Sequence, residues 1–98
     1  DCLIEGPVGI DIALDAYAAK VKKIGSEVGG KADILLVPDI HSGNFLGKSA
    51  EYFGHFPIGG MVVGAKVPIL IVSRADKAES KLNSILLGAN ECLGGNDV

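Results

Sequence analysis

Two short apolar runs constrain the fold of this chain more than any other feature. They are Ile34–Val37 and Val67–Val72, the second with Pro68 near its start. An uninterrupted apolar run of this length is typical of a strand covered on both faces, as in parallel sheets flanked by helices. Proline is tolerated near the start of such a strand and is costly in its middle. We therefore expect two buried strands.

Three other segments carry the periodicity of amphipathic helices, with apolar residues three or four positions apart. They are residues 10–23, residues 42–54 and residues 76–92. In the last of these, we expect an apolar stripe that includes Leu82 and Leu86 to face the core, and Ser84 to face water.

The order of the elements predicts the fold class. Leu3–Glu5 indicates a short first strand, and Met61–Val63 a strand joined in a hairpin to the 67–72 run by a link that contains Gly64. Strands that alternate with helices indicate a single α/β domain over residues 1–98, with a mainly parallel sheet flanked by helices. The carboxyl ends of parallel strands meet at one edge of such a sheet, where ligands bind.

Length, charge and cysteine content narrow the class of protein further. The 98 residues are 48% hydrophobic, which suits one compact domain, and the net charge of −3 argues against nucleic acid or an anionic membrane as a partner. No apolar stretch approaches the roughly 20 residues of a membrane-spanning helix.

Cys2 and Cys92 have no neighbours at metal-ligand spacing, so we expect no metal site. We interpret them as buried free thiols of a reduced, cytoplasmic compartment, and the sequence leaves a disulfide between them open.

The second apolar run ends in a cluster of polar side chains, Ser73-Arg74-Ala75-Asp76. One interpretation is structural, because patterns of the capping-box type begin at both Ser73 and Asp76, so that one of them caps the next helix. The other interpretation is functional. A helix needs only one N-cap, and an arginine beside free backbone N–H groups suits an anion such as phosphate.

The first apolar run is followed by Asp39 and a loop-like segment, where Ser42 or Asn44 is a candidate N-cap for the next helix. The functional interpretation places Ser42, Asn44 and Lys48 close together at a helix start, where they suit an oxyanion. We interpret His41 as a surface residue rather than a general base. The turn at Gly6 and Pro7 follows the first predicted strand, and all three loops would meet at the same edge of the sheet.

Several common site motifs are absent from the sequence. It contains no Walker motif, no G-x-G-x-x-G and no G-x-S-x-G. Nucleotide hydrolysis, dinucleotide binding and serine hydrolase chemistry therefore lack support.

Longer motifs carry a resemblance to a known family. The segments "ADILLVPDIHSGNFLGKS" and "VVGAKVPILIVSRADKAESKLNSI", with the Gly6-Pro7 turn, resemble the carboxyl-terminal part of the phosphate acetyl/butyryl transferase family over about residues 4–87. The stretches "VGAKVPI" and "SRAD" resemble the butyryl branch more than the acetyl branch. The chain begins with Asp1, in what already resembles a strand, and we expect it to be a fragment of a longer protein.

The resemblance implies both a reaction and a fold. Members of the family convert acyl-CoA and phosphate reversibly to acyl phosphate and free coenzyme A, which is a substrate and not a permanently bound cofactor. They are generally homo-oligomers. Their fold has two α/β lobes similar to those of isocitrate and isopropylmalate dehydrogenases, with the active site in the cleft between the lobes. A fragment with one part of this cleft would be nearly inactive.

The resemblance also implies roles for individual residues. Arg74 would hold a phosphate group of the acyl phosphate or of coenzyme A, and Ser73 would donate a hydrogen bond to the developing oxyanion or the leaving group. Asp76 completes the predicted catalytic set. The predicted substrate-binding residues are Gly6, Pro7, Asp39, Ser42, Gly43, Asn44 and Lys48.

One position departs from the family pattern. The acetyl branch carries an acidic residue several positions after its Ser-Arg pair, proposed as the base that deprotonates the thiol, and the equivalent position here is Ser80. The base is then Asp76 or Glu79, or it is unnecessary because a cationic pocket lowers the pKa of the thiol.

Two other functions fit the same residues. The first is a non-catalytic module that binds phosphate or coenzyme A through these loops. Titrations that show binding without turnover would identify such a module. The second is a structural lobe for dimerisation that uses the apolar stripe of the last helix.

Overall fold

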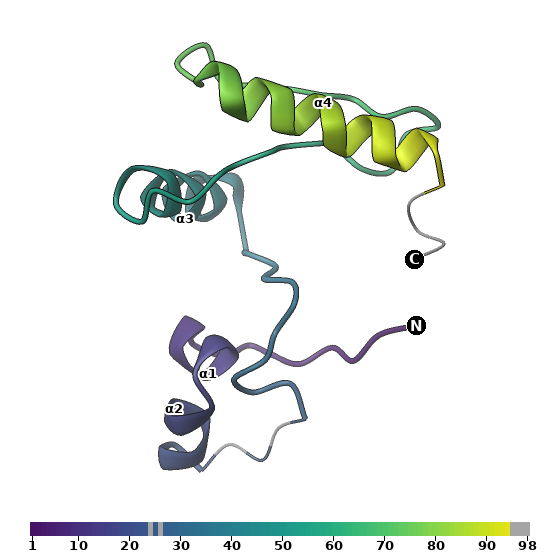
Figure 1. Cartoon of the computed structure of the whole chain (residues 1–98). Helices are drawn as coiled ribbons and strands as arrows, with labels where there is room; N and C mark the ends of the chain where they lie inside the picture. The colour runs from purple at the N-terminus through teal and green to yellow at the C-terminus, as the bar shows by residue number, and fades with distance from the viewer. Residues whose placement is uncertain (24, 26, 95–98) are drawn as a thin grey trace. The chain divides into compact units, whose positions relative to one another are not determined.

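The computed structural model describes residues 1–23, 25 and 27–94, and the chain divides into two compact units. The first unit, Asp1–Ile40, contains α1 (Ile10–Leu14) and α2 (Ala16–Val21). The second unit, His41–Val98, contains α4 (Ala78–Cys92) and all but the first residue of α3 (Ile40–Tyr52) (Figure 1). Within the described ranges, no helix is both long enough and apolar enough to cross a membrane.

The single helix predicted over residues 10–23 is divided at Asp15. The backbone of Asp15 is extended, and its side chain accepts a hydrogen bond of 2.9 Å from the N–H of Tyr17, which is the usual interaction of an N-cap. A new helix therefore begins after Asp15. Among the residues of this unit that the structure describes, the buried apolar ones are Ile12, Ala13 and Ala19.

Residues 30–32 lie against the two short helices. The N–H of Gly30 donates to the carbonyl of Ile12 at 2.8 Å. Gly30 has a φ of +80°, and a Cβ at this position would lie 2.4 Å from the backbone nitrogen of Ala16. Only glycine satisfies both the positive φ and the close approach.

An ion pair joins the ends of the helical pair. The Lys22 ammonium, just after α2, donates a hydrogen bond to the carboxylate of Asp11 in the first turn of α1. This hydrogen bond lowers the pKa of Asp11, and the N–H of Ile12 adds a smaller effect in the same direction.

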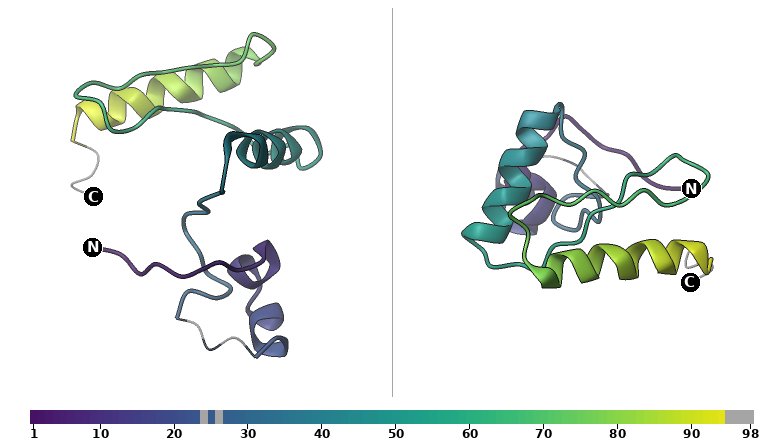
Figure 2. Two further views of the ribbon diagram at one scale, coloured as in Figure 1. Left: turned by 180° about the vertical axis from the view of Figure 1, so that it is seen from behind. Right: turned by 90° about the horizontal axis from the view of Figure 1, so that it is seen from above.

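In the second unit, two extended segments run along α4 and turn back beside its carboxyl-terminal end (Figures 1 and 2). The outgoing segment is fixed by side chains of the helix. Asn83 Nδ2 donates to the carbonyl of Ile58 at 3.3 Å, and Ser84 Oγ accepts from the N–H of Gly60 at 2.9 Å. The returning segment crosses α4 at Gly88, where a Cβ would lie 2.9 Å from Leu70 Cδ2.

The predicted hairpin is present as a single antiparallel bridge. The N–H of Val62 donates to the carbonyl of Ile69 at 2.8 Å. The other predicted strands are not assigned as strands in the described part of the chain, and Leu36 in the first apolar run is 95% exposed. An extended segment becomes a strand only beside a second backbone that completes its hydrogen bonds. The α/β class and the mainly parallel sheet stay predictions.

α4 buries the face opposite to the one expected. Its buried residues are Ser80, Ser84 and Gly88. Its large apolar side chains Leu82, Ile85 and Leu86 are 54%, 56% and 57% exposed. The prediction that Ser84 faces water is wrong, since this residue is only 2% exposed. Only small residues let the extended segments lie directly on the helix, so these segments cover the face that carries Ser84 and Gly88.

Both cysteines are free and exposed in the structure. Cys92 is the last residue of α4, and Cys2 lies in the extended segment before α1. The prediction that the two thiols are buried is therefore wrong for this chain, while the prediction that they are unpaired agrees with the structure.

Candidate functional site

A pocket of about 180 Å³ in the second unit lies between one face of α3 and the turn before α4. Its lining residues are Gly43, Asn44, Gly47, Lys48, Glu51, Ile58, Ser73 and Asp76. Those from α3 recur at intervals of three or four positions and so share one side of the helix. The sequence-predicted residues that this pocket brings together are Gly43, Asn44, Lys48, Ser73 and Asp76.

α3 begins earlier than predicted, and this places its polar residues on the helix itself. The helix starts at Ile40, so the segment expected to be a loop forms its first turns. Ser42 and Asn44 lie inside the helix, and the prediction that one of them is the N-cap is wrong. The sequence does offer a signal for the earlier start, because Asp39, a residue type favoured at N-caps, stands directly before Ile40.

The segment 73–76 forms a tight turn that is closed by two hydrogen bonds between its ends. The N–H of Asp76 donates to the carbonyl of Ser73 at 3.0 Å, and the N–H of Ser73 donates to Asp76 Oδ2 at 2.8 Å. Ser73 Oγ also accepts a longer hydrogen bond, of 3.4 Å, from the N–H of Ala75. The polar groups of this segment therefore fix the shape of the turn.

The turn ends before α4 begins. The N-cap of α4 is Lys77, and its side chain makes no capping hydrogen bond. The structural interpretation, in which Ser73 or Asp76 caps this helix, is therefore wrong. Their side chains serve the turn instead, which leaves them beside the pocket.

A cation shared by two carboxylates joins the turn to α3. Lys48 Nζ lies 3.5 Å from Asp76 Oδ1 and 3.8 Å from Glu51 Oε2. The two carboxylate side chains are only 13% and 18% exposed, whereas that of Lys48 is 39% exposed. Residues that are far apart in the sequence thus form one electrostatic cluster, in which one positive charge faces two negative charges.

Other predicted site residues do not line this pocket. Arg74 belongs to the same turn but is exposed, and Ser42 is half-buried in the first turn of α3. Gly6 and Pro7 are exposed in the extended segment before α1, and Asp39 is exposed just before α3. These last three belong to the first unit. Their convergence with the residues of the second unit stays a prediction.

Glu51 also lines the pocket and brings an ionisable carboxylate to it, although the sequence analysis did not select this residue. It lies three positions after Lys48 and seven after Asn44, so helical periodicity places all three on one face. That periodicity is the signal that identifies it.

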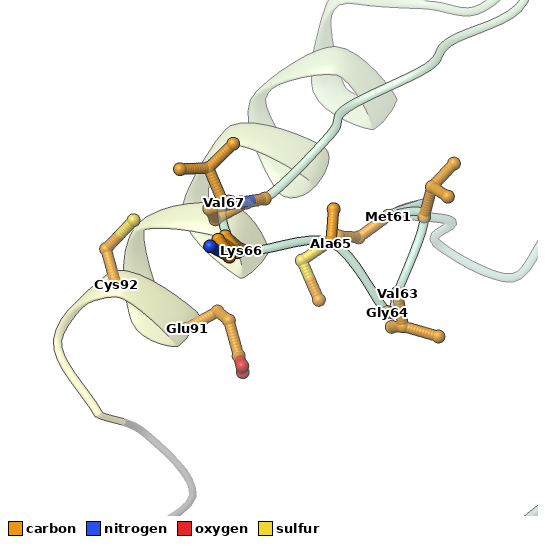
Figure 3. Close-up of a pocket in the computed structure, with 10 residues that line it drawn as sticks. Met61, Val63, Gly64, Ala65, Lys66, Val67, Glu91 and Cys92 are labelled. Atoms are coloured by element: carbon orange, nitrogen blue, oxygen red, sulfur yellow. The ribbon is translucent and has the colours of Figure 1, made fainter.

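A second pocket, of about 360 Å³, lies at the other end of the same unit (Figure 3). It is formed by the hairpin turn at residues 61–68 and by Glu91 and Cys92 from the last turn of α4. It contains none of the predicted site residues. In the described part of the chain, no group of three or more His, Cys, Asp and Glu side chains is arranged to hold a metal ion.

Comparison with known proteins identifies the family. Residues 1–89 match the family model described as phosphate acetyl/butaryl transferase. The chain belongs to this family. It is 50% identical over 86 residues to the probable phosphate butyryltransferase of Bacillus subtilis. The aligned region covers 88% of this chain and 29% of that relative. It is 44% identical over 87 residues to the phosphate acetyltransferase of Rickettsia felis, covering 89% of the chain and 25% of the relative.

A solved structure extends the similarity to the backbone. The crystal structure of a branched-chain phosphotransacylase from Enterococcus faecalis V583 matches with a TM-score of 0.80 and 41% sequence identity. The match covers 89% of this chain and 33% of that one. The chain thus spans between a quarter and a third of the length of these relatives.

Proposed function

We propose that this chain is part of a phosphate acyltransferase, similar to phosphate butyryltransferase, which transfers an acyl group reversibly between coenzyme A and phosphate. The observation that carries the proposal is the pocket in which Asn44 and Lys48 of α3 meet Ser73 and Asp76 of the turn. Membership of the family and the similarity to phosphate butyryltransferases of other organisms support it. Coenzyme A acts as a substrate, and no permanently bound cofactor is part of the proposal.

The chemistry of the reaction suits the groups in this pocket. When phosphate attacks the thioester carbonyl, negative charge develops on the carbonyl oxygen before the coenzyme A thiolate leaves. Donors that are already fixed in place stabilise this charge without reorganising. We assign that role to the Ser73 hydroxyl and the Lys48 ammonium, both of which line the pocket.

The charge balance of the pocket requires a further cation for phosphate. Lys48 faces two carboxylates, so the cluster carries an excess of one negative charge. A phosphate dianion entering this cluster alone would be repelled. We assign the compensating cation to Arg74, which is in the same turn as Ser73 and whose fork of N–H groups can bind phosphate through two hydrogen bonds.

The rest of the substrate site is proposed on the motifs of the family. Gly6, Pro7, Asp39, Ser42 and Gly43 would contact substrate together with the residues of the pocket. The chain would belong to the carboxyl-terminal part of a two-lobed, cytoplasmic and homo-oligomeric transferase. Its residues 1–98 would form one α/β domain similar to a lobe of isocitrate or isopropylmalate dehydrogenase. The TM-score of 0.80 to the branched-chain phosphotransacylase supports the view that this chain folds as one part of such a transferase.

The proposal is tested with the full-length transferase that contains this chain. Release of the coenzyme A thiol from butyryl-CoA and phosphate can be followed with a chromogenic thiol reagent. Ser73→Ala is expected to lower kcat about 10²-fold, the usual effect of removing one oxyanion donor. Arg74→Ala is expected to raise KM for phosphate about tenfold or more, because it removes a charged hydrogen bond. Lys81→Ala, which removes an exposed charge on α4, is the matched control and is expected to leave both constants unchanged.

Three outcomes would contradict parts of the proposal. Activity of Arg74→Ala at the wild-type level would remove its assigned role. Robust turnover by residues 1–98 alone would refute the view that the active site needs a second lobe. If the full-length protein binds coenzyme A and phosphate in calorimetric titrations but shows no turnover, it is a binding module and not an enzyme.

A further inference from the structure

Asp76 uses both of its carboxylate oxygens to hold other parts of the pocket. Oδ2 accepts the N–H of Ser73 at 2.8 Å, and Oδ1 lies 3.5 Å from Lys48 Nζ. Its side chain is only 13% exposed, so water competes weakly for these contacts. The two groups that it engages belong to the turn and to α3, respectively.

We propose that Asp76 is a positioning residue that sets the Ser73 turn and the Lys48 ammonium at a fixed separation, and not the base that deprotonates the thiol. This inference rests on the proposed function, in which Ser73 and Lys48 are the donors to the developing oxyanion. Donors stabilise that charge well only when their positions are fixed before the reaction. A carboxylate that bridges the two donors supplies this condition.

The contacts of Asp76 also argue against the role of a base. A base takes up a proton in every turnover, and protonation of Asp76 would release Lys48 while the substrate has to be held. The charged neighbours make this release stronger, because Glu51 on α3 competes for the same ammonium at 3.8 Å. Arg74 and Lys77, which flank Asp76 in the sequence, add cations on its own segment.

The kinetic test uses the full-length transferase with Asp76→Asn and Asp76→Ala. The amide oxygen of Asn can still accept the N–H of Ser73, whereas Ala removes both contacts. We expect Asp76→Ala to lower kcat at least tenfold. Asp76→Asn is expected to lower kcat less, because it keeps the Ser73 contact and loses only the charge that holds Lys48, and to leave the shape of the pH profile of kcat/KM unchanged. Asp33→Asn, the same substitution at an exposed position, is the control. Loss of one limb of the pH profile in Asp76→Asn, together with a fall in kcat of about 10³-fold or more, would overturn the proposal and identify a base.

A second readout does not depend on activity. Exchange of the Ser73 amide with deuterated solvent is expected to be about tenfold faster in Asp76→Ala and near the wild-type rate in Asp76→Asn. An unchanged rate in Asp76→Ala would overturn the positioning role. If the wild-type protein shows no acyl transfer, the proposed function fails, while the amide exchange still decides whether Asp76 holds the turn.

Discussion

Ser84 is one of two residues of α4, with Asn83, whose side chains hold the extended chain of the second unit, and its removal gives a sharp test of this packing. Its hydroxyl accepts the N–H of Gly60 at 2.9 Å and donates to the carbonyl of Ser80 at 3.0 Å. The side chain is 2% exposed, so no water can easily replace it. We predict that Ser84→Ala weakens the attachment of residues 58–60 to the helix.

The magnitude follows from the contacts. Leaving the Gly60 N–H without its acceptor costs about 1–3 kcal/mol, and the better helix propensity of alanine offsets about 0.5 kcal/mol of this. The net loss of about 0.5–2.5 kcal/mol in the free energy of local opening corresponds to roughly 2- to 70-fold faster exchange of the Gly60 amide. Ser80→Ala is the matched control, because Ser80 contributes only its backbone carbonyl and both hydrogen bonds of Ser84 remain.

The assay is amide hydrogen exchange measured residue by residue on the wild-type protein and the two variants. We expect the Gly60 amide to exchange faster in Ser84→Ala and at nearly the wild-type rate in Ser80→Ala. If Ser84→Ala leaves the exchange of Gly60 unchanged, or if both variants accelerate it equally, the hydrogen bond does not hold this segment.

Two further predictions concern the first unit. Gly30→Ala places a Cβ 2.4 Å from the backbone nitrogen of Ala16 at a φ of +80°. This substitution is expected to destabilise the unit by about 2 kcal/mol or more in urea unfolding. The control is Gly25→Ala, which should change the stability little because no atom lies within 4 Å of the added Cβ. Because Lys22 lowers the pKa of Asp11 below 3.8, their ion pair contributes stability that is fully present above about pH 3.8 and is lost as the pH falls through the lower pKa of the folded state. Carboxyl NMR titration should show the pKa of Asp11 rising toward 3.8 in Lys22→Gln, and an identical titration in both proteins would contradict this cause.

The sequence predicted the long helices well because their periodicity is strong and local. The last helix was expected over residues 76–92 and is found at Ala78–Cys92. Its start was placed too early because Asp76 resembles an N-cap but bonds back to Ser73. The break at Asp15 was missed for a related reason, since apolar spacing continues across a residue whose side chain caps the next helix.

Burial was predicted less well than the elements themselves. Apolar spacing indicates which residues share a face, but not which face another segment covers. In α4 the extended chain approaches along Ser84 and Gly88, because their small size permits contact at short distance. Strands depend even more on distant partners, so the run at Ile34–Val37 could be recognised from its composition but not placed in a sheet.

The candidate site was predicted in part. Asn44, Lys48, Ser73 and Asp76 were grouped from their positions after two apolar runs, and the structure places all four around one pocket. Their orientation was beyond the sequence, since it depends on the hydrogen bonds that close the turn. The carboxylate of Glu51 was not anticipated, because charged residues on helices are usually solvated.

The exposed leucine and isoleucine side chains of α4 have a practical consequence for anyone who produces residues 1–98 alone. Leu82, Ile85 and Leu86 form an apolar strip more than half open to water, and such strips adhere to one another and to hydrophobic resins. Concentrated samples of the segment are therefore expected to self-associate, and a solubility tag or mild detergent to suppress this. The handling of the isolated segment is governed by this strip of the helix, far more than by the polar residues that surround the pocket.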